Sequence, residues 1–127
     1  MDNLRYIDLK TYEILDNPVG YIPCDKEISD IIALLNKKGY ITKSSCAGHN
    51  HISYNNGIEI LGESTYIVFD KNYDFSNLPE EFTYENGHLY KLVDYYDDAS
   101  TNRKTSKEIE NELNNNWNSL RNWANKL

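Results

Sequence analysis

Hydrophobic residues recur at helical spacing in the stretch CDKEISDIIALLNKKGY. Four apolar residues have offsets of 0, 3, 4 and 7 and would share one face of a helix: Ile28, Ile31, Ile32 and Leu35. Asp25 precedes this pattern as an N-cap residue, and Lys37, Lys38 and Gly39 follow it as a C-terminal stop. The pattern predicts a helix between Asp25 and Gly39.

A second helical pattern fills the C-terminal residues 105–127. Thr105 and Glu108 have the spacing of a capping box at its start. The apolar stripe consists of Ile109, Leu113, Trp117, Leu120, Ala124 and Leu127. Because the far side is rich in asparagine, a weak helix former, we expect the helix to depend on the packing of Trp117 and its neighbours.

Alternating or β-branched segments predict strands at residues 3–15, 40–44, 51–54, 64–70 and 88–96. Asn17 and Pro18 form a turn signal after the first of them. Strands outnumber the helices that could cross over between parallel strands, which disfavours a doubly wound sheet. The sequence therefore predicts one α+β domain over residues 1–127, with a mainly antiparallel sheet of about five strands covered by two principal helices.

Length and cysteine content restrict the class of protein further. A chain of 127 residues has a common size for one domain with its own core. Cys24 and Cys46 are its only cysteines, no leader pattern opens the chain, and no apolar run is long enough to cross a bilayer. We expect a cytoplasmic protein without membrane contact, in a reducing compartment.

The net charge of −7 is unevenly distributed. Residues 61–100 carry nine acids and two bases, whereas residues 101–127 carry three acids and five bases. An acidic middle segment disfavours direct nucleic-acid binding, because affinity for phosphates comes chiefly from lysine and arginine. Solubility alone would also account for such a segment.

The stretch ITKSSCAGHNHISY places reactive side chains around a glycine, between two predicted strands. Hydroxyls, backbone amides and an imidazole in such a loop could hold a carboxylate, a phosphate or a ribose, or position a thiolate nucleophile. The predicted ligand-binding residues are Ser44, Ser45, Cys46, Gly48 and His49. In the alternative interpretation, Cys46 is a small buried hydrophobe, Gly48 is a turn residue and His49 lies on the surface.

The segment from Val19 to Asp70 resembles the core of the wybutosine-synthesising tRNA methyltransferase family. In that family an acidic residue opens a helix, a strand runs into the sequence Ser-Ser-Cys-Ser-Gly-Arg, and a further strand follows. Here the corresponding parts are CDKEISDIIALLNKKGY, SSCAGH and YIVFD. The whole segment from Val19 to Asp70 covers about two fifths of the chain. The chain is also similar to small proteins of low-GC Gram-positive bacteria and their phages that carry a Cys-x-Gly-His loop.

The first resemblance implies that Ser44, Ser45, Cys46 and Gly48 belong to the family's loop. Ala47 replaces the family's serine, and His49 replaces its arginine. An imidazole that changes charge near neutral pH thus stands where the family has a permanent bidentate cation. A nucleotide-like small molecule is the candidate ligand of the loop, and binding can survive such changes where catalysis does not.

Two other chemistries use the same residues. Cys24, Cys46, His49 and His51 have the ligand atoms of a zinc site, although Cys24 lacks a partner cysteine at zinc-knuckle spacing, so we assign no metal. Cys46, His49 and Asp25 have the residue types of a catalytic triad, with nothing in their spacing to support one. The sequence identifies neither a catalytic residue nor a cofactor.

A different class of function uses the acidic segment. It contains six tyrosines, Tyr66, Tyr73, Tyr84, Tyr90, Tyr95 and Tyr96. Tyrosine among carboxylates suits contact with a basic protein groove. The predicted partner-binding residues are Glu80, Glu81, Tyr95, Tyr96, Asp97 and Asp98. We expect a phage or mobile-element binding protein that acts without turnover, as an inhibitor of a basic host protein, with a small-molecule or methyltransferase-like function of the SSCAGH loop as the alternative.

Overall fold

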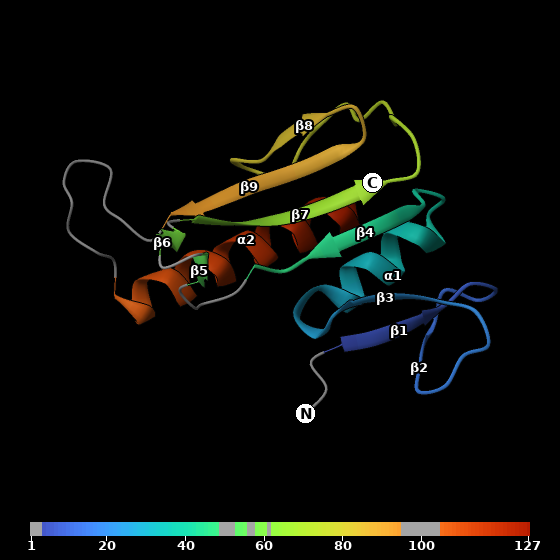
Figure 1. The fold of residues 1–127 in the computed structure, drawn as a ribbon. Coiled ribbons are helices and arrows are strands. Elements are labelled where there is room, and N and C mark those ends of the chain that lie inside the picture. The colour runs from blue at the N-terminus through green and yellow to red at the C-terminus, as the bar shows by residue number, and fades with distance from the viewer. Residues whose placement is uncertain (1–3, 49–52, 56–57, 61, 95–104) are drawn as a thin grey trace.

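The strands of the computed structural model form three antiparallel sheets within the residues that it describes, 4–48, 53–55, 58–60, 62–94 and 105–127 (Figure 1). The first sheet has the order β2-β1-β3 and consists of β1 (Leu4–Asp8), β2 (Ile14–Leu15) and β3 (Tyr21–Asp25). The second has the order β4-β7-β9-β8 and consists of β4 (Thr42–Cys46), β7 (Gly62–Phe69), β8 (Thr83–Glu85) and β9 (His88–Asp94). A hairpin of β5 (Ser53–Asn55) and β6 (Ile58–Ile60) is the third. With its helices this is the expected α+β class, although the strands divide between separate sheets.

The first predicted helix begins as a 3-10 turn, η1 (Lys26–Ile28), and continues as α1 (Ser29–Lys37). It contacts both larger sheets and the C-terminal helix α2 (Ser106–Lys126). Its central position explains why nearly all of its apolar side chains are buried, among them Ile28, Ile31, Ile32 and Leu35. Gly39 follows the C-cap residue Lys38, and its φ of +97° suits a residue without a side chain.

Asn36 fixes the turn from α1 into β4. Its buried amide nitrogen donates to the carbonyl oxygen of Ile32 at 2.8 Å and to Oγ1 of Thr42 at 3.0 Å. Its amide oxygen accepts from the backbone N–H of Thr42 at 3.1 Å. These bonds determine where β4 begins, and β4 leads directly into the SSCAGH loop.

The predicted capping box at the start of α2 is confirmed, since Thr105 and Glu108 each accept a hydrogen bond from the other's backbone N–H at 3.1 Å. The buried arc of α2 is wider than the predicted stripe. Trp117 is half-buried, while Trp123 and Asn116 are buried although neither was predicted to be. The arc widens because α2 packs against the four-stranded sheet, α1 and the loop 76–80.

Two polar contacts fasten α2 to α1. Nζ of Lys38 donates to three carbonyl oxygens at the end of α2, those of Ala124 at 2.8 Å, Asn125 at 3.1 Å and Leu127 at 2.8 Å. A cation at this position also offsets the negative end of the helix dipole. Arg121 forms two hydrogen bonds with the Asp30 carboxylate, at 2.8 and 3.1 Å.

The strand register divides the four-stranded sheet into two faces. Residues directly opposite one another in antiparallel strands share a face. One face, here called the covered face, packs against α2 and carries Ser45, Thr65, Ile67, Leu89 and Lys91. The other, called the open face, carries Cys46, Tyr66 and Tyr90 in one row and Ser44, Val68, His88 and Glu85 in the next. Figure 1 shows α2 behind the sheet.

A bulge at Lys43 sets the phase of β4. Thr42 pairs with Phe69 and Ser44 with Val68, so two residues of β4 advance while β7 advances by one. As a result Thr42 is buried, whereas Ser44, two residues later, is exposed on the open face.

The three-stranded sheet differs from the single N-terminal strand predicted for residues 3–15. Oδ2 of Asp8 accepts hydrogen bonds from the backbone N–H groups of Lys10 at 3.0 Å and Thr11 at 2.9 Å. This side-chain turn, followed by Tyr12 at a φ of +57°, separates β1 from β2. These hydrogen bonds also hold the pKa of Asp8 below its usual value, and the largest contribution comes from the N–H of Thr11.

Candidate functional site

The SSCAGH loop leaves the end of β4 between the two faces of the sheet. Ser44 is exposed and Cys46 is half-buried, and both lie on the open face. Ser45 lies on the covered face, where its Oγ is buried and has no hydrogen-bond partner among the described residues. Gly48 is buried, and His49 lies outside the described residues. The five predicted ligand-binding residues therefore do not share one surface, since Ser45 and Gly48 face the interior.

Ala47 anchors the loop to three other elements. Its N–H donates to Oδ2 of Asp25, at the end of β3, at 2.8 Å. Its carbonyl oxygen accepts from Nε1 of Trp117, on α2, at 2.8 Å and from Oγ1 of Thr65, on β7, at 2.9 Å. The peptide groups of Ala47 are thus fixed from both sides, and one of the carboxylate oxygens of Asp25 serves this loop.

Gly48 allows α2 to approach the loop. Its φ is +86°, and a Cβ there would lie 2.7 Å from Cδ2 of Leu113 and 3.1 Å from Oγ1 of Thr65. A side chain at this φ would be strained and would crowd Leu113 and Thr65, so glycine suits the position. Its N–H donates to Sγ of Cys46 at 3.4 Å. Because the amides of Ala47 and Gly48 already have acceptors, an anion held by this loop would have to rely on its other groups.

A buried chain of polar groups lies behind the loop, on the covered face. The amide of Asn116 donates to Oγ1 of Thr65 at 3.2 Å and accepts from Nζ of Lys91 at 2.8 Å. Nζ of Lys91 also lies 3.6 Å from carboxylate oxygens of Glu81 and Glu112. No sequence pattern identifies this row of polar groups, because Asn116 is one of several asparagines in its helix. Its polar groups satisfy one another, so it stabilises the packing of α2.

Cys24 is a buried thiol. Burial, and secondarily the charges of Asp25 and Asp30, raise its pKa to about 12. A thiol with such a pKa stays protonated near neutral pH and is a poor nucleophile. No group of three metal-ligating side chains occurs among the described residues, and His49 and His51 lie outside them. The zinc and triad interpretations stay predictions.

The acidic segment contributes exposed carboxylates from residues 70–86. This stretch carries five acids and one base, and all five acidic side chains are exposed: Asp70, Asp74, Glu80, Glu81 and Glu85. Of the predicted partner-binding residues, Glu80 and Glu81 lie here, in the turn before β8. Tyr95, Tyr96, Asp97 and Asp98 lie outside the described residues.

The tyrosines of the segment divide between core and surface. Tyr73 and Tyr84 pack with Phe69 and Phe75 against the core. Tyr66 and Tyr90 instead face each other across the two central strands of the sheet, on the open face. Among the four tyrosines of the segment that the structure describes, only the second pair is placed to contact a partner.

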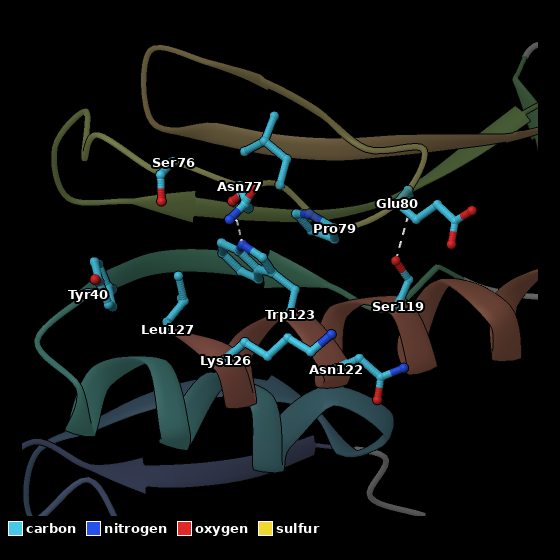
Figure 2. Close-up of a pocket in the computed structure, with 11 residues that line it drawn as sticks. Tyr40, Ser76, Asn77, Pro79, Glu80, Ser119, Asn122, Trp123, Lys126 and Leu127 are labelled. Carbon is cyan, nitrogen blue, oxygen red and sulfur yellow. Dashed lines mark hydrogen bonds between the residues drawn. The ribbon is translucent and has the colours of Figure 1, made fainter.

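A cavity of about 520 Å³ lies between the loop 76–80 and the C-terminal half of α2 (Figure 2). Nε1 of Trp123 donates to the carbonyl oxygen of Asn77 at 2.8 Å, and Oγ of Ser119 donates to that of Glu80 at 3.2 Å. Both bonds are drawn in Figure 2 and tie the loop to the helix. Glu80 therefore borders this cavity, while its backbone helps to hold the loop.

A second cavity, of about 690 Å³, lies on the open face. Its lining includes Ser44, Tyr66 and Val68 from β4 and β7, and Glu85, His88 and Tyr90 from the β8–β9 hairpin. Sequence reasoning did not single out Glu85 and His88. The dipeptide Asn86-Gly87 could have identified them, because it is a strong signal for a two-residue hairpin turn that places the flanking residues opposite each other.

Comparison with protein-family models, with curated proteins and with solved structures gave no match. The resemblance of the SSCAGH segment to the wybutosine-synthesising methyltransferases therefore stays a prediction. No helix in the described part of the chain combines the length and apolarity needed to cross a membrane.

Proposed function

We propose that this chain is a binding protein that acts without turnover and whose partner is a basic protein surface. The observation that carries the proposal is the exposure of all five carboxylates of residues 70–86, of which Glu85 lies on the open face of the four-stranded sheet. An inhibitor of phage or mobile-element type, seated in a basic groove of a host protein, would use such a surface. Cys24 and Cys46 form no disulfide, which suits the reducing cytoplasm as the compartment.

The charges of this segment serve association better than folding. Asp74 and Glu80 have no ion-pair partner among the described residues, and exposed charges contribute little to the stability of a monomer. A concentration of one sign instead steers a partner of opposite charge and fixes its orientation. Glu81 has a second role, because it lies 3.6 Å from Nζ of Lys91.

Charge reversal tests this proposal. The variant Asp74→Lys with Glu80→Lys should lose most of its affinity for a short synthetic peptide rich in arginine and lysine, while its circular dichroism and melting temperature stay unchanged. The matched control, Asp16→Lys with Glu110→Lys, makes the same charge change at exposed positions on other elements. Binding should also weaken as salt rises, since screening acts over about 8 Å at physiological ionic strength.

Two results would contradict the proposal. In one, the wild-type protein does not bind the peptide even at low salt. In the other, the two double variants lose affinity equally, because the effect would then come from net charge and from no particular surface. Capture of the host partner with the wild-type protein, and its loss with the first variant only, would extend a positive result to the cell.

A small-molecule function of the SSCAGH loop is the second candidate. The observation in its favour is the buried Oγ of Ser45, which has no hydrogen-bond partner in the described part of the chain although most buried polar atoms have one. A ligand that binds the folded state should raise the melting temperature. S-adenosylmethionine and nucleotides are the compounds to test. The rise in melting temperature that a binding compound causes should disappear in the variant Ser45→Ala.

A further inference from the structure

The β8–β9 hairpin holds the carboxylate of Glu85 over the open face, without a partner among the residues that the structure describes. Asn86 and Gly87 have φ values of +49° and +83°, as a tight two-residue turn of this kind requires. The turn places Glu85 directly opposite His88, beside the next row that contains Tyr90. Within the described part of the chain, the carboxylate of Glu85 has neither a hydrogen bond nor an ion pair, and it is exposed.

Tyr66 and Tyr90 line the cavity beside this carboxylate. They pair directly across β7 and β9, so their Cβ atoms lie about 4.5–5.5 Å apart, as in any such pair. Tyr90 is 36% exposed and Tyr66 is half-buried, so their side chains are supported below and accessible from the open face. Aromatic rings next to a carboxylate attract cations by two independent effects, ring quadrupole and charge.

We propose that the open face binds an arginine side chain of a basic partner. The guanidinium plane stacks on the ring of Tyr90 or Tyr66, and its N–H groups donate to the carboxylate of Glu85. This inference rests on the proposed function and specifies which feature of the basic partner is recognised. The cavity of about 690 Å³ is in the usual size range for a binding pocket. It accommodates the arginine side chain of the partner together with the partner residues next to that arginine.

Charge complementarity selects the occupant. An arginine is favoured over a lysine, because a planar guanidinium can stack and donate two parallel hydrogen bonds at once, whereas an ammonium is a compact point charge. A nucleic acid could also stack on two tyrosines. Its phosphates would, however, be repelled by the five acids of residues 70–86, which have a single base among them.

The test uses three peptides of the same length, in which the central residue of an otherwise basic sequence is arginine, lysine or citrulline. Citrulline has nearly the shape of arginine without its charge. Isothermal titration with the full chain should give the tightest binding for arginine, then lysine, then citrulline. Backbone amide signals of Glu85 and Tyr90 should move in nuclear magnetic resonance spectra only when the central residue is a cation.

Variants separate the two parts of the subsite. Glu85→Gln should weaken binding of the arginine peptide by about tenfold, and Tyr90→Leu by roughly fivefold. Tyr90→Phe keeps the ring and should retain the affinity. The matched controls are Glu110→Gln and Tyr21→Leu, which remove an exposed carboxylate and an exposed ring elsewhere and should change little.

The outcomes distinguish this inference from the function on which it rests. If the arginine peptide binds and Asp74→Lys with Glu80→Lys abolishes binding, but Glu85→Gln and Tyr90→Leu have no effect, the arginine subsite is overturned and the basic partner stands. If no basic peptide binds, both are overturned. Equal affinity for the arginine and citrulline peptides, or tighter binding of a single-stranded oligonucleotide, also overturns the subsite.

Discussion

The two faces of the four-stranded sheet are made by the same strands, yet their side chains have opposite surroundings. On β7, Thr65 is buried and bonded to Ala47 and Asn116, whereas the next residue, Tyr66, lies on the open face. On β9, Lys91 is held by Asn116, whereas Tyr90 is exposed. Polar groups on the covered face are largely used within the protein, so the groups left for a partner are those of the open face.

The largest difference between the faces should appear in stability. Ile67 is fully buried on the covered face, and Ile67→Ala should lower the free energy of unfolding by about 2–5 kcal/mol. Its neighbour Val68 is only half-buried on the open face, and Val68→Ala should cost less than about 1 kcal/mol. Urea denaturation of both variants measures the difference. Equal losses would mean that the open face is covered in solution.

Polar groups of the two faces should differ by a smaller amount. Thr65→Val keeps the shape of the side chain but removes the partner of the Asn116 amide, which should cost about 1–3 kcal/mol. Ser64→Ala, one residue earlier on the open face, should change stability by no more than about 0.5 kcal/mol. A Thr65→Val protein as stable as the wild type would show that the buried polar chain contributes nothing.

The smallest effect concerns the layer that covers the sheet. A hydrogen bond from Arg121, and then its charge, hold the pKa of Asp30 below its usual value. Because the pKa is lower in the folded than in the unfolded state, the stabilisation is present above the unfolded-state pKa of about 3.9 and is lost as pH falls through the folded-state pKa. Asp30 is exposed, so the contribution should be less than about 1 kcal/mol.

The variant Asp30→Asn checks this contribution. Its unfolding free energy should fall less steeply between pH 5 and pH 2 than that of the wild type. Asp16→Asn is the control for the loss of one exposed carboxylate. If both variants show the wild-type slope, the pair with Arg121 does not stabilise the folded state.

Local signals in the sequence predicted the helices well and the strands less completely. The capping box of Thr105 and the apolar spacing of α1 depend on residues close in sequence, and both are confirmed. β3 was missed because Pro23 interrupts its apolar run. Proline has no backbone N–H to donate, and it is tolerated there because β3 is the edge strand of its sheet.

The surroundings of the SSCAGH loop could not be read from sequence. Alternation along β4 does place Ser44 and Ser45 on opposite faces. The acceptors and donors of Ala47, however, come from Asp25, Thr65 and Trp117, which lie 22, 18 and 70 residues away along the chain. Such contacts follow from tertiary packing, and no local pattern encodes them. The open face was more accessible to prediction, because Asn86-Gly87 defines its hairpin locally.

The bulge in β4 makes the strand unequally sensitive to changes in its length. Without Lys43, Thr42 would still pair with Phe69 and Ser44 with Val68, because the bulge is the extra residue between those pairs. Loss of a residue between Ser44 and Cys46 would instead turn the following side chains to the opposite face. A chain could therefore lose the residue at position 43 and keep the same side chains on the same faces, whereas a deletion at any of the next three positions would turn the side chains beyond it over.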